Sequence, residues 1–214
     1  GVYLHATESN KNTFLTGVAT DSHRLSSSSI AVDNMKSFTS IIIPRKTVFQ
    51  LCSLLDNVDE KLFIQTSSNK IKFSLGKINL ISKVIDGKFP DYQKVVPKEN
   101  TKTLTVSSKD FINSVERVAS VSIDRKEGVK VTLDKDSIQL FVNSSSSGEG
   151  KENLAANYNA ENLTISFNSR YLLDIASEIE DENIIMTLAD SVSPVLIQDN
   201  SDKHSYYVIM PMKI

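Results

Sequence analysis

The sequence repeats one short unit three times: a β-rich run, a small polar break, and then an amphipathic stretch of helical period. The β-rich runs begin at Ile41, Leu104 and Leu163, so successive copies start 63 and 59 residues apart. A near-constant interval of this size indicates repeated supersecondary units. The apolar positions of the three amphipathic stretches follow the spacing of one buried helix face. They are Val48, Leu51, Cys52 and Leu55, then Phe111, Val115 and Val118, then Leu172, Ile175, Ala176 and Ile179.

After each predicted helix the apolar pattern changes to period two, which is typical of half-buried strands. The alternating residues are Ile71, Phe73 and Leu75 before a Gly76-Lys77 turn, and Val129, Val131, Leu133, Ile138, Leu140 and Val142 around Asp134-Lys135-Asp136. Such pairs of runs predict antiparallel hairpins. One helix and several strands per repeat predict an α+β fold, in which helices cover one face of each antiparallel sheet.

The chain has 214 residues and a mass of 23.7 kDa, which is enough for two ordinary domains. The change from the irregular segment 89–102 to a fresh strand at Leu104 marks the best boundary, so we expect domains at residues 1–100 and 101–214. Residues 1–34 carry only the strand part of a repeat, without a preceding helix. We therefore expect the chain to begin partway through a domain.

Composition argues against several classes of protein. The chain has 24 basic and 26 acidic side chains, so its bulk charge would not hold it on nucleic acid or on an anionic membrane. No apolar run approaches the roughly 20 residues of a membrane-spanning helix, and no glycine-rich phosphate-binding loop is present. The single cysteine, Cys52, is expected to be a buried apolar residue in a reducing compartment. We expect a cytoplasmic protein without a cofactor and without a membrane partner.

A basic residue stands at the start of every predicted helix. These residues are Lys46, Lys109 and Arg170, with Arg45 added in the first copy. Cations in a first helical turn oppose the helix dipole by about 0.3–1 kcal/mol, so their recurrence suggests an external anion such as DNA phosphate. Long basic side chains that bend away into solvent are the other interpretation. The pattern alone favours the solvated interpretation and leaves the phosphate interpretation open.

Two groups of residues suggest catalysis, and neither forms a convincing site. Asp21, Ser22 and His23 are the three side chains of a hydrolytic triad, but in a strand Ser22 would point away from the other two. A metal could bind the acidic run Glu178, Glu180, Asp181 and Glu182, but no histidine lies near it in the sequence. We expect no catalytic residue and no metal site. A hydrolase or nuclease, and a plain peptide-binding adaptor, remain the alternatives.

The C-terminal segment 206–214 stays apolar to its last residue, although chain ends are usually polar. A strand docked in its own sheet would account for Tyr207 and Ile209. The sequence Met210-Pro211-Met212 breaks the strand pattern and supplies adaptable thioether side chains of the kind found in peptide grooves. On the residues alone, a core strand and a groove are equally supported.

Five ordered motifs together resemble one known family. They are ATDSHRL at 19–25, IPRK at 43–46, SKVIDGKFPDY at 82–92, TLADSVSPVLIQD at 187–199 and YVIMPMKI at 207–214. In this order and at this spacing they resemble segments of the bacterial DNA sliding clamp, the beta subunit of DNA polymerase III. The resemblance covers essentially the whole chain, from the middle of the family's second domain through its third.

This resemblance implies tandem sliding-clamp domains, with antiparallel sheets outside and helices on the inner face. The family forms a head-to-tail homodimer of three-domain subunits that encircles double-stranded DNA without reading its sequence, as a non-catalytic processivity factor. Arg45 and Lys46 match DNA-facing residues of the family, whereas Lys109 and Arg170 are DNA-binding candidates from the repeat alone. The surface that would meet the first domain is expected to be exposed and includes Val121, Glu149 and Glu152.

The resemblance also implies a groove in which the replicative polymerase, the clamp loader and repair proteins dock short linear motifs. One side would comprise Thr20, Ser22, His23, Arg24 and Leu25 with Pro90, Lys94 and Val95. The other side would comprise Asn168, Tyr171, Val192, Pro194, Val208, Ile209, Met210, Pro211, Met212, Lys213 and Ile214, with Met210, Pro211 and Met212 as floor and gate. Three departures bear on motif preference: Ser22 replaces a common glycine, Lys94 a common arginine, and Pro194 a small polar residue.

Overall fold

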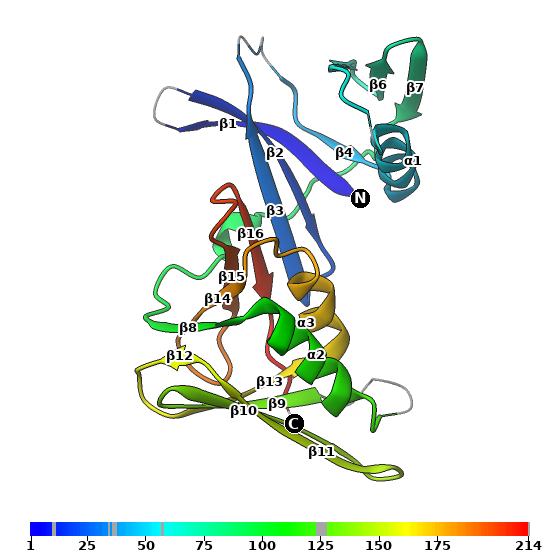
Figure 1. The fold of residues 1–214 in the computed structure, drawn as a ribbon. Helices are drawn as coiled ribbons and strands as arrows, with labels where there is room; N and C mark the ends of the chain where they lie inside the picture. The colour runs from blue at the N-terminus through cyan, green and yellow to red at the C-terminus, as the bar shows by residue number, and fades with distance from the viewer. Residues whose placement is uncertain (10–11, 34, 36–37, 57, 123–127, 214) are drawn as a thin grey trace. The chain divides into compact units, whose positions relative to one another are not determined.

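The computed structural model describes residues 1–9, 12–33, 35, 38–56, 58–122 and 128–213. The chain divides into two compact units (Figure 1). Unit 1 comprises Gly1–Ala19 with Ser27–Asp91, and unit 2 comprises Thr20–Ser26 with Tyr92–Ile214. The short segment Thr20–Ser26 therefore packs with residues that follow it by 66 positions or more.

Unit 2 contains the repeat of one strand, one helix and three strands twice. The first copy comprises β8 (Lys102–Ser107), α2 (Ser108–Ala119), β9 (Gly128–Asp134), β10 (Ser137–Ser144) and β11 (Gly148–Ala155). The short strand β12 (Asn157–Tyr158) precedes the second copy, which comprises β13 (Leu163–Asn168), α3 (Ser169–Ala176), β14 (Asn183–Leu188), β15 (Val195–Asp199) and β16 (Ser205–Ile209). The helices predicted from the apolar periodicity are confirmed in both copies, and the hairpin predicted around Asp134-Lys135-Asp136 is confirmed as β9 and β10.

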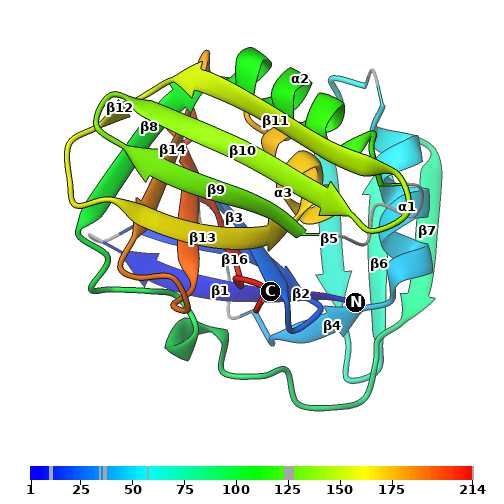
Figure 2. The ribbon, with the colours of Figure 1, turned by 90° about the horizontal axis from the view of Figure 1, so that it is seen from below.

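The two copies exchange their first strands. β13 pairs antiparallel with β9, which gives a sheet in the order β11-β10-β9-β13. β8 pairs antiparallel with β14, so that β12, β8, β14, β15 and β16 lie side by side in a second sheet. Figure 2 shows α2 and α3 beside one another, on one face of the β11-β10-β9-β13 sheet. This arrangement confirms the predicted antiparallel α+β architecture for unit 2.

The core of unit 2 lies between the helices and the sheets. The apolar positions predicted for the second and third repeated helices are all buried, although the last of them lies just beyond the end of α3; they are Phe111, Val115 and Val118, then Leu172, Ile175, Ala176 and Ile179. Burial of each large apolar side chain contributes roughly 1.5–3 kcal/mol. A side-chain cap stabilises the N-terminus of each helix. Ser107 Oγ accepts a hydrogen bond from Asp110 N, and Asn168 Oδ1 accepts hydrogen bonds from Arg170 N and Tyr171 N.

Unit 1 has a smaller core and one α-helix among its described residues. Its elements are β1 (Val2–Ser9), β2 (Asn12–Thr20), β3 (Arg24–Ala31), β4 (Ile41–Ile43), α1 (Arg45–Leu55), β5 (Leu62–Thr66), β6 (Lys70–Leu75) and β7 (Ile78–Lys83), although Thr20 and the first residues of β3 belong to unit 2. β3, β2, β1 and β4 are neighbours in one sheet, and β5-β6-β7 form another. The core comprises Ile41, Ile43, Ile71 and Phe73.

The predicted burial of Cys52 is wrong, because its side chain is exposed. Val48 and Leu51 of α1 pack on the core of unit 1 and are half-buried, while Thr47 is the buried residue of the helix. The described part of unit 1 holds no second helix against which the Cys52 side of α1 could pack.

Within the described residues, no helix is long and apolar enough to cross a membrane.

Candidate functional site

Residues 21–23 form a tight turn between β2 and β3, and not a strand. Asp21 Oδ1 accepts hydrogen bonds from His23 N at 3.1 Å and from Arg24 N at 3.0 Å. Thr20 Oγ1 donates to Arg24 O at 2.8 Å and accepts from Ser22 N at 3.2 Å. The strand geometry used to reject the Asp-Ser-His triad was therefore wrong. The carboxylate of Asp21 serves the turn, because both of its oxygens accept hydrogen bonds from the turn or from Arg24.

The guanidinium of Arg24 is held from two sides over an aromatic ring. Arg24 Nε donates to Asp21 Oδ2 at 3.1 Å, and Arg24 Nη1 donates to Asp174 Oδ2 at 2.6 Å. Arg24 Cζ lies 4.4 Å from the centre of the Tyr171 ring, a cation–π contact. The His23 ring lies 6.2 Å from the Tyr171 ring, with 27° between their planes. We name this group of side chains the Arg24 cluster; it comprises Asp21, His23, Arg24, Tyr171 and Asp174.

The pKa values of this cluster follow from its contacts. Burial alone would lower the pKa of Arg24, but hydrogen bonds and charge from Asp174 and Asp21 raise it above its ordinary value. Burial alone would raise the pKa of Asp21, but hydrogen bonds from His23 N, Arg24 N and the Arg24 side chain hold it below its ordinary value. Both groups are therefore charged at neutral pH.

The C-terminal segment runs past this cluster. Met210 N donates to His23 O at 2.8 Å, and Met212 N donates to Ser166 O at 2.7 Å. Val208 and Ile209 are buried in β16, whereas Met210, Pro211 and Met212 follow the strand and are half-buried. The segment thus divides into a core strand and a partly exposed Met-Pro-Met stretch. The core-strand interpretation is confirmed for Tyr207 and Ile209, whereas a groove at Met210, Pro211 and Met212 stays a prediction.

The other predicted groove residues lie on several different elements and differ in their exposure. Val95 and Val192 are large apolar side chains with 47% and 63% of their area exposed. Lys94 is exposed at the end of a short 3-10 helix, Tyr92–Lys94, and Pro194 is half-buried. Leu25 is buried, the Asn168 side chain caps α3, Lys213 is exposed, Pro90 belongs to unit 1, and Ile214 lies outside the described residues.

Several residues that shape this region were missed by the sequence analysis. Asp174 is one of them, although it lies three residues after Tyr171 on α3 and so on the same helix face. Asp190 accepts hydrogen bonds from Val192 N at 2.8 Å and from Ser193 N at 2.7 Å, and so orders the loop that carries Val192. Asn100 Nδ2 donates to the carbonyl of Pro194 at 3.0 Å. No local sequence pattern marks Asn100, because its partners lie about 90 residues further along the chain.

The basic residues predicted to bind DNA all lie in exposed first turns. α1 starts at Arg45 without a side-chain cap and without an acidic residue in its first turn. Lys46 is exposed beside it, and the Arg45 guanidinium lies 5.2 Å from the centre of the Phe49 ring. Lys109 and Arg170 stand at the starts of α2 and α3, which contact each other within unit 2 (Figure 1).

Strand β11 forms one edge of its sheet and contacts α2. Arg117 of α2 forms an ion pair with Glu152 of β11, with Nη2 to Oε2 at 2.7 Å. Hydrogen bonds from Arg117 and Ser114 lower the pKa of Glu152 to about 2. Among the residues expected to be exposed on this surface, Glu149 is exposed, whereas Val121 and Glu152 are half-buried.

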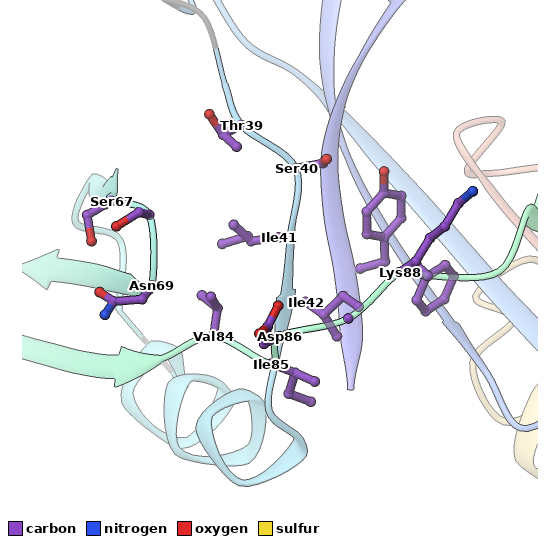
Figure 3. A pocket seen from close by; sticks show the side chains of 14 residues that line it. Thr39, Ser40, Ile41, Ile42, Ser67, Asn69, Val84, Ile85, Asp86 and Lys88 are labelled. Atoms are coloured by element: carbon purple, nitrogen blue, oxygen red, sulfur yellow. The ribbon is translucent and has the colours of Figure 1, made fainter.

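A cavity of about 600 Å³ lies in unit 1 beside β4 (Figure 3). Thr39, Ile41 and Ile42 line it from β4 and the residues before it, and Ser67 and Asn69 line it from the turn between β5 and β6. The segment from Val84 to Phe89 closes another side. Among the residues that the structure describes, none of those predicted to bind DNA or to form the groove lines this cavity.

Comparison with known proteins identifies the same family in both parts of the chain. Residues 1–91 match the family model described as "DNA polymerase III beta subunit, central domain". Residues 93–213 match the model described as "DNA polymerase III beta subunit, C-terminal domain".

Curated relatives carry the name "Beta sliding clamp". The protein from Caulobacter vibrioides (strain NA1000 / CB15N) is 36% identical over 215 residues, which cover 100% of this chain and 58% of the relative. The protein from Escherichia coli (strain K12) is 35% identical over 197 residues, which cover 92% of this chain and 54% of the relative. The chain thus spans a little over half the length of these relatives.

Solved structures of sliding clamps match the fold. The DnaN sliding clamp (DNA polymerase III subunit beta) of Bartonella birtlesii bound to griselimycin has a TM-score of 0.93 and 42% identity, and the match covers 100% of this chain and 58% of that chain. The DNA polymerase sliding clamp of Caulobacter crescentus has a TM-score of 0.95 and 36% identity, covering 100% and 57%. The expected tandem sliding-clamp fold is confirmed by these neighbours.

Proposed function

The chain belongs to the DNA polymerase III beta subunit family, and from this premise we propose that it acts as part of a processivity factor that encircles double-stranded DNA. The proposed role is topological and non-catalytic: the ring tethers its partners to DNA and performs no chemistry on it. Such a role in DNA replication agrees with a cytoplasmic protein. The division of the chain at residue 100 stays a prediction.

Local cations support the proposed contact with DNA. The chain as a whole has a net charge of −2, so attraction to phosphate depends on where its cations lie. Arg45, Lys46, Lys109 and Arg170 are exposed in first helical turns, where a cation is unfavourable for the helix itself. Contacts with phosphate position a protein without reading the sequence. Weak contacts of this kind are compatible with sliding along the duplex.

The observation that carries the proposed docking function is the Arg24 cluster beside the Met-Pro-Met stretch. Rings and a guanidinium held in place offer a preformed surface, while half-buried methionines offer an adaptable one. The exposed apolar side chains Val95 and Val192 add anchoring area in the same unit. We assign this surface to short linear motifs of the replicative polymerase, the clamp loader and repair proteins.

The edge of β11 supports a homodimer of the full-length protein. An edge strand presents unpaired backbone N–H and C=O groups, which can pair with a strand of another subunit. Glu149 is an exposed carboxylate on this strand and suits a basic side chain of the partner surface, whereas the charge of Glu152 is already paired with that of Arg117. The head-to-tail contact would therefore form along β11 and the adjoining end of α2.

Titration calorimetry with griselimycin tests the groove, because the Bartonella birtlesii clamp is bound to this compound. We expect saturable binding to the folded chain and at least roughly tenfold weaker binding by the double variant Met210→Ala/Met212→Ala. Met35→Ala, which changes a half-buried methionine of unit 1, is the matched control and should bind like the wild type. A folded wild-type chain that binds no griselimycin would contradict the proposed groove.

A further inference from the structure

We propose that Asp174 is a positioning residue of the groove: it holds the Arg24 guanidinium flat against Tyr171, and so preforms one wall for a peptide stretch without acidic side chains. This inference rests on the proposed docking function and assigns a task within it to a residue that does not itself line the wall.

The contacts of the guanidinium define its orientation. Asp21 accepts from Nε and Asp174 accepts from Nη1, so the two carboxylates approach different edges of the guanidinium plane. The Tyr171 ring covers one face at 4.4 Å from Cζ. An arginine side chain has many rotamers and loses much conformational freedom when a ligand orders it. Fixing it in the free protein removes that cost from the binding step.

The two carboxylates have different tasks. Asp21 also accepts hydrogen bonds from His23 N and Arg24 N, so a change at Asp21 would disturb the turn itself. The side-chain contact that links Asp174 to this site is its ion pair with Arg24, and its side chain is 46% exposed. A substitution at Asp174 should therefore change the orientation of Arg24 without disturbing the turn.

The position of Asp174 is unfavourable for its own helix. It lies in the last turn of α3, which ends at Ala176, and a carboxylate near a helix C-terminus opposes the helix dipole. The ion pair with Arg24, a residue 150 positions earlier in the chain, compensates for this placement. A carboxylate here is thus explained by the groove and not by local helix chemistry.

Charge indicates the chemistry of the ligand segment. One guanidinium with two carboxylates leaves the Arg24 cluster with one negative charge in excess. Arg24 Nη2 carries N–H groups that neither carboxylate takes up. A peptide carbonyl oxygen can accept from Nη2 without competing for the charge of Arg24, whereas an acidic side chain would be repelled by Asp21 and Asp174. The wall therefore fits a peptide segment that offers a backbone carbonyl and carries no acidic side chain.

A double-mutant cycle with griselimycin as the probe tests whether Asp174 acts through Arg24. Asp174→Asn should weaken binding about fivefold, and Arg24→Met, which keeps an apolar stem over Tyr171, should weaken it at least as much. In the Arg24→Met background, Asp174→Asn should change the affinity less than about twofold. Glu178→Gln removes an exposed carboxylate just beyond α3 and serves as the charge-matched control.

The outcomes separate this inference from the proposed function. Absence of binding by the folded wild type would overturn both. Wild-type binding with no loss in Asp174→Asn, or with an equal loss in the presence and absence of Arg24, would overturn only the role of Asp174. Circular dichroism melting verifies that the variants fold. If Asp174→Asn fails to fold, Asp174→Ser takes its place in the same cycle, and Asp174→Glu should keep more affinity than either.

Discussion

Ser22 occupies a backbone conformation that side chains with a Cβ rarely adopt. Its φ angle is 75°, in the left-handed region that favours glycine. The hydrogen bonds of Thr20 and Asp21 hold the turn in this shape despite the strain. A glycine at this position would adopt the angle without strain, so the identity of residue 22 acts directly on the backbone energy of the turn.

Ser22→Gly should therefore stabilise the chain by about 1 kcal/mol, since relief of the strain outweighs the greater flexibility of glycine in the unfolded state. Urea denaturation followed by circular dichroism measures the change. Ser26→Gly is the matched control, because Ser26 is exposed in β3 and has no positive φ. Its substitution should lower stability by about 0.5–1 kcal/mol. Equal effects of the two substitutions would contradict the strain at Ser22.

Contacts between individual residues were only partly predictable from the sequence. Apolar periodicity located helices and strands, because burial of one face repeats along the chain; Phe111, Val115 and Val118 are buried as predicted. Periodicity did not locate the ion pair of Arg24 with Asp174, which depends on the fold as a whole. It also misjudged Cys52, since an apolar face is buried only where another element covers it.

At the scale of elements, α2 and β11 are fitted closely to each other. A Cβ added at Gly150 would lie 3.0 Å from the carbonyl oxygen and 3.1 Å from the Cα of Val118, both backbone atoms of α2. The Arg117–Glu152 ion pair joins the same two elements. Because Gly150 has no side chain, β11 can lie close to α2, and the Arg117–Glu152 ion pair joins the two elements.

Gly150→Ala should push β11 away from α2 and destabilise the chain by about 1–3 kcal/mol, as overpacking against backbone does. Thermal or urea unfolding measures this loss. Gly17→Ala is a suitable comparison, because a Cβ at Gly17 would meet only the Val2 side chain, at an ordinary 3.6 Å. If both substitutions left the unfolding midpoint unchanged, the close approach would be refuted.

The ion pair predicts a pH dependence. With a pKa of about 2 in the folded chain and 4.5 when unpaired, Glu152 binds a proton more readily in the unfolded state. Its contribution to stability is therefore fully present above pH 4.5 and is lost as the pH falls towards 2. Carboxyl NMR titration should show the low pKa of Glu152 in the wild type and a clearly higher pKa in Arg117→Gln, which keeps only the hydrogen bond from Ser114. The effect on stability should be small, because both side chains are partly exposed.

At the scale of the whole molecule, the two units differ in how well their strands are covered. Unit 2 buries Tyr158, Phe111 and Phe167 almost completely. In unit 1, Phe63 of β5 and Ile81 of β7 expose 64% and 61% of their area. Strands with few buried apolar contacts open more readily, and local opening sets the rate of amide exchange.

Hydrogen exchange measured by mass spectrometry should therefore be slower in β9, β10 and β13 than in β5, β6 and β7, by roughly tenfold or more. Val131→Ala, in the core of unit 2, should speed exchange in unit 2 and leave β5–β7 unchanged. Uniform exchange across both sets of strands would show that the chain opens as one cooperative body.

Unit 2 is assembled from two separate stretches of chain, Thr20–Ser26 and Tyr92–Ile214. A gene exchange at residues 91 and 92 would keep the cores of both units intact, yet it would pair Arg24 from one parent with Asp174 and Tyr171 from the other. Chimaeras between distant relatives would then inherit mismatched halves of the proposed docking surface. In any functional hybrid the short turn Thr20–Ser26 should therefore come from the same parent as residues 92–214, although the two stretches are separated in the gene.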